Sequence, residues 1–118
     1  MPKPTVLPLW FGGQTGISNA LDLSTVGPVV GIIAPPDWTP TVVSIEGSAN
    51  GTDFYPIYDT TASTELRFNV HPGTMVAINP NRLRCCMAIR LRSGSHDAPP
   101  LPQGVAREFG IVVESATP

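Results

Sequence analysis

Hydrophobic and polar positions alternate along much of this chain with the period of two that is typical of β-strands. The clearest case is residues 41–48, where one face would carry Val43, Ile45 and Gly47 and the other Val42, Ser44 and Glu46. Asn50-Gly51 follows, and this pair supplies the positive φ angles of a tight hairpin turn. Residues 54–58 are then predicted to be the return strand.

Further short strands are predicted wherever an alternating or continuous apolar run is bounded by glycine, proline or asparagine. These runs are residues 20–24, 29–33, 66–70, 75–78, 83–92 and 109–113. No 3.6-residue period persists for three turns, so no long helix is expected. Seven to eight short strands with regular turns predict an all-β fold, a single antiparallel β-sandwich of jelly-roll-like or discoidin-like type over residues 20–118.

Residues 1–19 are predicted to form an extended N-terminal arm, because three prolines favour extended backbone and several glycines interrupt regular structure. Its apolar side chains are unusual for a disordered tail and are predicted to form an interface: Val6, Leu7, Leu9, Trp10 and Phe11. Two destinations stay open, the edge of its own domain or a neighbouring subunit, since 19 extended residues span on the order of 60 Å. Deleting residues 1–13 is expected to weaken assembly and leave the sandwich folded.

Composition narrows the class of protein. The 118 residues suit one domain with its own core. Only 14% of them are charged, against about a quarter in most soluble domains. This low charge indicates either a surface partly covered by neighbours or a neutral surface rich in Ser, Thr and Asn. The net charge of −2 gives no basic field for nucleic acid, and neither a membrane span nor a secretory signal is found.

No catalytic or metal-binding constellation emerges from the residue types. His71 and His96 lie in predicted turns or loops with no nucleophile motif beside them. Cys85 and Cys86 would point to opposite faces of a strand, so we expect two free thiols and no zinc site. The Asn50–Asp53 segment is explained by turn chemistry without calcium. We therefore expect a protein that is not an enzyme and has no cofactor or metal.

Two groups of side chains are candidates for contacts with other molecules. Arg84, Arg90 and Arg92 would share one face of the strand at 83–92. They could pair with glutamates of the same sheet, contact another subunit, or bind an anion; the lack of aromatics there disfavours single-stranded nucleic acid. Trp38 would either cap one end of the sandwich or, with Tyr55, contact a partner or a glycan.

The segments Trp38-Thr39-Pro40, residues 43–54 and Ile57-Tyr58-Asp59 resemble a W-T…F-x-A-S-x-D-G-x-x-F…L-Y-D pattern. Small virion accessory proteins of tailed bacteriophages, prophages and gene transfer agents carry this pattern. Leu91-Arg92-Ser93-Gly94, a Pro-rich loop and a last strand are also similar, so the resemblance covers residues 28–114. The chain departs from the pattern at Glu46, where the family more often has a neutral residue, and in its Cys85-Cys86 pair.

This resemblance implies a non-enzymatic structural protein of a phage-like particle, of the head-decoration or head-spike-base type. Such a protein would be made in the bacterial cytoplasm and end in the virion. It would form a homo-oligomer and dock on the major capsid protein or on a spike or fibre. Similar S-x-N/D-G-x-x-F/W hairpins occur in discoidin-like sandwiches that bind sugars. The alternative function is therefore a carbohydrate-binding module that recognises surface glycans through Trp38 and Tyr55.

Overall fold

The computed structural model describes residues 4–12, 16–38, 41–59, 64–95, 99–101, 104 and 106–114. Eleven strands and one short 3-10 helix lie within these ranges. The strands are β1 Pro4–Phe11, β2 Leu21–Asp22, β3 Val29–Ile33, β4 Thr41–Ser48, β5 Tyr55–Pro56, β6 Tyr58–Asp59, β7 Thr64–Glu65, β8 Arg67–Val70, β9 Met75–Ala77, β10 Ala88–Ser93 and β11 Arg107–Glu114. The helix, η1, is Pro80–Leu83.

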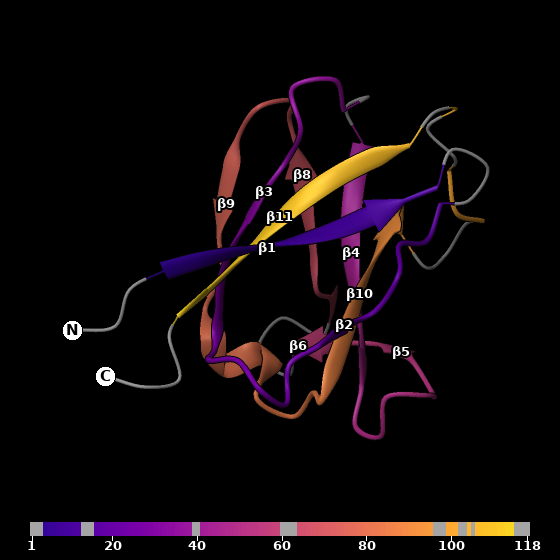
Figure 1. Ribbon diagram of the computed structural model, residues 1–118. Coiled ribbons are helices and arrows are strands. Elements are labelled where there is room, and N and C mark those ends of the chain that lie inside the picture. The colour runs from indigo at the N-terminus through magenta and orange to yellow at the C-terminus, as the bar shows by residue number, and fades with distance from the viewer. Residues whose placement is uncertain are drawn as a thin grey trace.

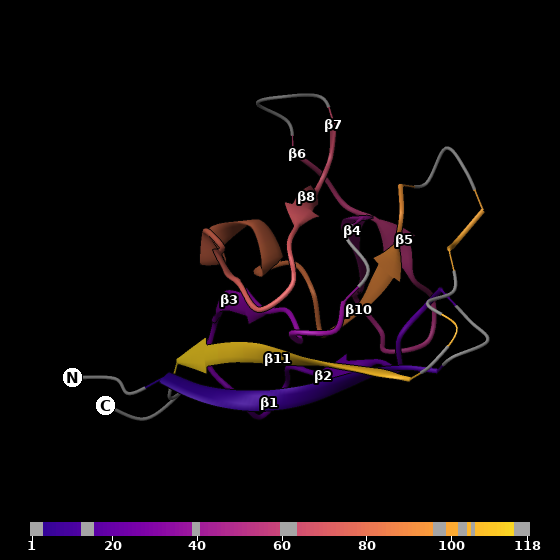
Figure 2. The same ribbon diagram turned by 90° about the horizontal axis from the view of Figure 1, so that it is seen from above.

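Two antiparallel sheets pack face to face (Figures 1 and 2). The first has the strand order β1-β11-β3-β9, and β1 and β11 lie at the front of Figure 1. The second has the order β2-β10-β4-β5, and β8 also pairs with β4. A small β6–β7 hairpin projects from this second layer in Figure 2. The predicted all-β antiparallel sandwich is confirmed, although short interruptions and β1 bring the number of strands above the expected seven or eight.

The core lies between the sheets and is filled mainly by alternate residues of the longer strands. In β11, Phe109, Ile111 and Val113 point inward and are at most 3% exposed. Three aromatic rings meet at one end of this core: the Phe11 and Trp38 centroids lie 5.3 Å apart, and Trp38 meets Phe109 edge-on at 4.8 Å. Edge-to-face packing of this kind adds roughly 0.5–1.5 kcal/mol per pair beyond burial.

The N-terminal segment belongs to the sandwich. β1 pairs with β11 along its whole length, from Pro4 opposite Glu114 to Phe11 opposite Arg107. Leu9 and Phe11 are fully buried in the core. Of the two destinations that the sequence left open, the structure shows the first: residues 4–11 form the edge strand of their own domain. Deleting this segment would remove a strand and part of the core, so the structure argues against the expectation that the sandwich survives the deletion.

The predicted strand at 83–92 is half right, because β10 begins only at Ala88. Asn79 caps η1 by accepting a hydrogen bond from the Asn81 N–H, and Pro80 suits the first helical position. Leu83 packs into the core from this helix, and residues 84–87 form a turn closed by the Cys86 N–H to the Leu83 carbonyl at 3.1 Å. The alternation before residue 88 therefore reflects a helix and a turn.

The predicted hairpin turn at Asn50-Gly51 is in the right place, although the loop is longer than two residues. Gly47 pairs with Tyr55, and Gly51 has φ 85°. Asn50 holds the loop together, since its Oδ1 accepts the N–H groups of Thr52 and Asp53 at 2.9 Å each. Over the described part of the chain, no helix has the length and hydrophobicity needed to cross a bilayer.

Candidate functional site: the outer faces of the two sheets

The outer face of the first sheet is apolar, although it is turned away from the core. We call it the front face. The strand registers place its side chains on one surface: Val6, Pro8 and Trp10 of β1, Gly110 and Val112 of β11, Gly31 and Ile33 of β3, and Met75 and Ala77 of β9. Val6, Trp10 and Met75 are 55%, 51% and 66% exposed. An antiparallel sheet normally presents polar side chains to water on this side, so the exposed apolar side chains of the front face are unusual for such a sheet.

Gly110 lets the front face lie flat. A Cβ placed on it would lie 2.7 Å from Val6 Cγ1, so any larger residue would displace the Val6 side chain, whereas Ile33 Cβ at 3.5 Å would be in ordinary contact. Val112, beside it in β11, is only 8% exposed because its neighbours close over it. Among the residues described, the charged positions on this face are Glu108 and Glu114, at the two ends of β11. The face therefore has an apolar centre and an acidic rim.

The open edge of β1 is poorly suited to backbone pairing with another strand. The Trp10 N–H donates to Asn19 Oδ1 at 2.6 Å, and the Asn19 N–H donates to the Trp10 carbonyl at 3.0 Å. Alternate residues direct their backbone groups the same way in an antiparallel ladder, so Pro4, Val6 and Pro8 also face this edge. Of these four residues, Pro4 and Pro8 have no N–H, and the Trp10 N–H is already bound to Asn19. Prolines at such positions discourage edge-to-edge association, which leaves the face as the available surface of β1.

The outer face of the second sheet has the opposite character, because it holds charges that the chain itself covers. Glu46 of β4 is only 4% exposed and lies opposite Arg90 of β10. Arg90 Nε donates to Glu46 Oε1, and Arg92 Nη1 lies 3.9 Å from Glu46 Oε2. The Arg90 guanidinium also stacks 4.5 Å from the centre of the Phe54 ring. We call Glu46, Arg90, Arg92 and Phe54 the Glu46 cluster.

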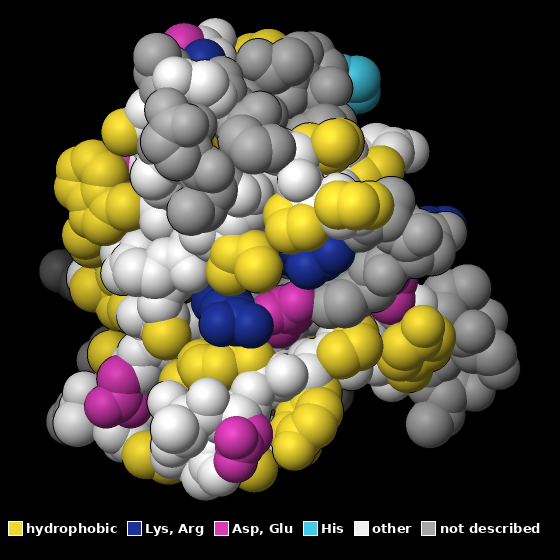
Figure 3. Space-filling view, turned by 90° about the vertical axis from the view of Figure 1, so that its right-hand side faces the viewer, with side chains coloured by type: hydrophobic (Ala, Val, Ile, Leu, Met, Phe, Trp, Pro, Cys, Tyr) yellow, Lys and Arg dark blue, Asp and Glu magenta, His cyan; other side chains and the backbone are white. Residues whose placement is uncertain are grey.

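Residues 94 and 95 extend the sheet beside this cluster. Ser44 Oγ donates to the Gly94 carbonyl at 2.8 Å, the Gly94 N–H donates to the Val42 carbonyl at 2.6 Å, and Arg92 Nε donates to the Ser95 carbonyl at 3.4 Å. Figure 3 shows basic and acidic side chains side by side in the middle of this face, bordered by hydrophobic side chains. Of the three interpretations of the arginines, pairing within the sheet describes Arg90 and Arg92.

The structure does not bring Arg84 to the other two arginines. Arg84 follows η1, is exposed, and donates from Nε to Asn81 Oδ1 at 2.7 Å. The predicted arginine face is therefore corrected to a pair, because the strand that would have aligned all three begins after Arg84. Elsewhere Arg67 Nη1 lies 3.5 Å from Glu65 Oε1, and Arg107 Nη1 lies 3.2 Å from Asp37 Oδ2.

The predicted interface residues of the N-terminal segment lie on two different faces of β1, one turned to the core and one to the outside. Leu9 and Phe11 are buried and Leu7 packs against the core. These three residues were predicted to contact a partner, and the structure instead uses them inside the domain. Val6 and Trp10 lie on the front face. Of the two interpretations of Trp38, the structural one is confirmed, since Trp38 packs among core rings at one end of the sandwich. The contact with a partner or glycan was wrong, because Trp38 is only 1% exposed. Both faces of β1 carry apolar side chains, so its sequence does not reveal which face points inward.

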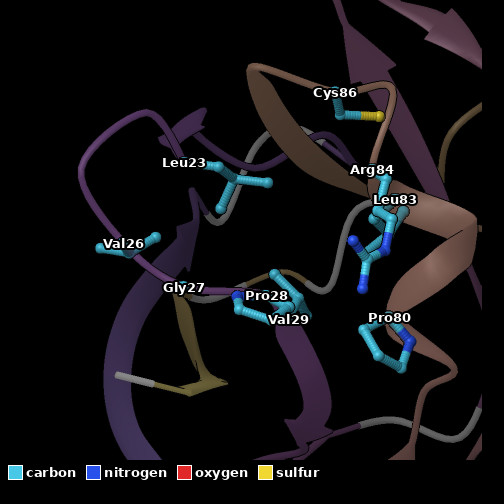
Figure 4. A pocket seen from close by; sticks show the side chains of 9 residues that line it. All are labelled: Leu23, Val26, Gly27, Pro28, Val29, Pro80, Leu83, Arg84 and Cys86. Atoms are coloured by element: carbon cyan, nitrogen blue, oxygen red, sulfur yellow. The ribbon is translucent and has the colours of Figure 1, made fainter. Parts of the chain in front are cut away.

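Tyr55 remains at the surface, 64% exposed. With Tyr58 it lines an open cavity of about 330 Å³, whose other walls include Ile57, Cys85 and Cys86. A second cavity of about 220 Å³ opens between the sheets near η1 and is mainly apolar (Figure 4). Its walls include Leu23, Val29, Leu83 and Arg84, and Cys86 belongs to both cavities.

The cysteines are free thiols, as expected, but their geometry differs from the prediction. They lie in the turn before β10, and their sulfur atoms are 3.9 Å apart on the same side of the chain. Burial, and next the charge of the neighbouring Cys85 thiolate, raise the pKa of Cys86 to about 12. Opposite orientation was inferred from a regular strand, which this segment does not form.

Within the described ranges, no three His, Cys, Asp or Glu side chains gather closely enough to hold a metal ion. His71 is exposed in a turn, and His96 lies outside the described residues. No protein-family model, curated protein or solved structure matches the chain. The resemblance of residues 28–114 to phage virion proteins therefore rests on its motif residues alone.

Proposed function

We propose that this chain is a non-enzymatic structural protein that associates with copies of itself and docks on a larger protein particle through its front face. The particle of this proposal is tailed-phage-like, following the motif resemblance, and the role is decoration, stabilisation or attachment of a spike. The observation that carries the proposal is the exposed apolar surface around Val6, Trp10 and Met75.

Physical chemistry supports association through this face. Apolar surface removed from water contributes about 25 cal/mol per Å², and large aromatic side chains such as Trp10 are common anchors at the centres of interfaces. The low charge of the chain, 14% of residues, fits a surface that is partly covered in the assembled state. The acidic rim at Glu108 and Glu114 favours docking on a particle surface whose own rim is basic, and it does not support contact between two copies.

The test of self-association measures mass in solution by light scattering over a wide range of protein concentration. We expect the mass of the wild-type protein to rise with concentration. The Val6→Ser/Trp10→Ser variant should stay monomeric with an unchanged circular-dichroism spectrum. Tyr58→Ser is the matched control, since Tyr58 is 59% exposed on a different strand pair. A wild-type protein that stays monomeric, or a double variant that associates equally well, would contradict the proposal.

The particle itself needs a separate test. Capsid, portal or tail genes next to the coding gene, followed by detection of the chain in purified particles, would support virion localisation. Particles that lack the chain although the cells produce it would contradict this part. In that case the mass measurement alone would decide whether the chain associates through the front face.

Carbohydrate binding is the second candidate function, favoured by the exposed Tyr55 and Tyr58 beside the 330 Å³ cavity. Aromatic rings at an open cavity provide stacking surfaces for sugar rings. A glycan array compares the wild-type protein with Tyr55→Ala. Binding that the substitution abolishes supports this candidate, and an array without signal, or one indifferent to the substitution, removes it.

A further inference from the structure

The turn between η1 and β10 brings two thiols together at a place where nothing in the proposed function requires them. Cys85 is exposed and Cys86 is half-buried, with 3.9 Å between their sulfur atoms. The turn is fixed on both sides of the pair, because the Cys86 N–H donates to the Leu83 carbonyl at 3.1 Å and the Met87 N–H donates to the Ser48 carbonyl at 2.7 Å.

The sulfur of Cys86 occupies a defined position against the second sheet. Gly47 of β4 leaves room for it, since a Cβ at that residue would collide with Cys86 Sγ and lie 2.8 Å from Ile57 Cδ1. The same sulfur forms part of the wall of both cavities. Its position therefore affects the shape of two cavities at once, while the Cys85 sulfur is open to reagents in solution.

We propose that Cys85 and Cys86 form an oxidisable dithiol, which a small-molecule disulfide such as oxidised glutathione closes to a disulfide within the turn at residues 84–87. The Cys85 thiolate first attacks one sulfur of the reagent, forming a mixed disulfide and releasing one glutathione thiolate. The Cys86 thiolate then attacks the Cys85 sulfur and releases the second glutathione. Two electrons pass to the reagent, and the two thiol protons end on the two released glutathione molecules.

The order of the two thiols follows from their surroundings. Cys85 reacts first with the reagent because it is exposed. Cys86 reacts second because the Cys85 sulfur, once bound to glutathione, is the electrophile within its reach. The raised pKa of Cys86 makes this second step faster at higher pH, where more of its thiolate is present.

Closure moves the sulfur atoms from 3.9 Å to about 2.05 Å apart. At least one of them must shift, and any movement of the Cys86 sulfur changes its contacts with Gly47 and the cavity walls that it helps to form. Adjacent Cα atoms are only about 3.8 Å apart, closer than the usual range for disulfides, so the closed form should be easily reduced. The disulfide is therefore formed reversibly and does not serve to stabilise the fold.

The experiment treats the reduced full chain with oxidised glutathione at pH 8, stops the reaction with acid, and alkylates the remaining thiols before intact-mass measurement and peptide mapping. The expected product has lost two hydrogen atoms, resists alkylation at both cysteines, and regains both thiols with dithiothreitol. Cys86→Ser should stop at a stable glutathione adduct on Cys85. Cys85→Ser should react at least about tenfold more slowly, because its remaining thiol is half-buried and mainly protonated.

Circular dichroism of both serine variants checks that they fold, and the rate of closure at pH 7, 8 and 9 checks the role of the Cys86 thiolate. Accumulation of the glutathione adduct on Cys85 in the wild-type protein, with no loss of two hydrogens, would overturn the proposal. So would oxidation that yields only chains linked to each other through Cys85. Neither result would affect the front face, which carries no cysteine.

Discussion

Apolar side chains are usually buried and charged ones exposed, but the two outer faces of this sandwich show the opposite. On the first sheet Trp10 and Met75 are more than half exposed, whereas on the second sheet Glu46 is almost completely buried. On the second sheet the charges have partners in the chain itself, since Arg92 donates to the Ser95 carbonyl and Arg90 stacks on Phe54. In the described chain, no segment covers the first sheet in the same way. The polar face is completed within one molecule, and the apolar face lacks a corresponding cover.

The physical costs explain why this difference matters. A buried carboxylate needs partners, and Glu46 has two arginines. An exposed apolar face needs no partner for folding, but it promotes association. The first arrangement therefore contributes to the stability of the monomer, and the second is the feature on which the proposed association rests. The following predictions use this distinction.

The largest expected effect separates the two sides of β1. Phe11→Ala should lower the free energy of unfolding by about 4 kcal/mol, because it opens a cavity beside Trp38 and Phe109. Trp10→Ala, one residue earlier on the front face, should change it by less than about 1 kcal/mol. Urea unfolding of both variants under monomeric conditions measures the contrast. Equal losses would mean that β1 is not seated with Phe11 inward.

Breaking the Glu46 cluster should be the next largest effect. Glu46→Gln leaves Arg90 and Arg92 without their carboxylate and should cost about 3 kcal/mol. Asp37→Asn removes the partner of Arg107 at a carboxylate that is 65% exposed, and should cost less than about 1 kcal/mol. Thermal and urea unfolding compare the two. A Glu46→Gln protein as stable as Asp37→Asn would show that the cluster is not desolvated.

A substitution at Gly110 tests how closely the front face packs on itself. Gly110→Ala should cost about 1 kcal/mol, because the new methyl group meets Val6 Cγ1. Most of that loss should disappear when Val6→Ala is added, so the two substitutions should not be additive. A double-mutant cycle by urea unfolding measures the coupling, and additive losses would place Val6 away from Gly110.

The smallest expected effect is a pH dependence from Cys86. Its pKa is about 12 in the folded protein and about 8.5 when unfolded. The unfolded state therefore loses the thiol proton first, so stability from this group is complete below about pH 8.5 and declines as pH rises towards 12. Cys86→Ser should show a shallower decline between pH 8 and 10 when unfolding is followed under reducing conditions. Identical slopes would contradict the raised pKa.

Much of the fold was predictable because β3 and β4 follow simple patterns: Val29–Ile33 is a continuous apolar run and Thr41–Ser48 alternates. The helix and turn before β10 could not be predicted, because Leu83 and Cys85 happen to continue the alternating pattern of that strand. The front face was only partly accessible to sequence reasoning. Val6 and Trp10 were identified as interface residues, but their alignment with Ile33 and Met75 depends on long-range strand order, which local periodicity does not encode.

Acrylamide quenching of tryptophan fluorescence tests the central claim most directly, because Trp10 is half exposed on the front face and Trp38 is buried. The Trp10→Phe variant supplies the signal of Trp38 alone. We predict that the quenchable fraction of wild-type fluorescence falls as protein concentration rises and the mass increases, since Trp10 becomes covered. Trp10 that stays fully quenchable in the associated protein would contradict the account and place the contact elsewhere.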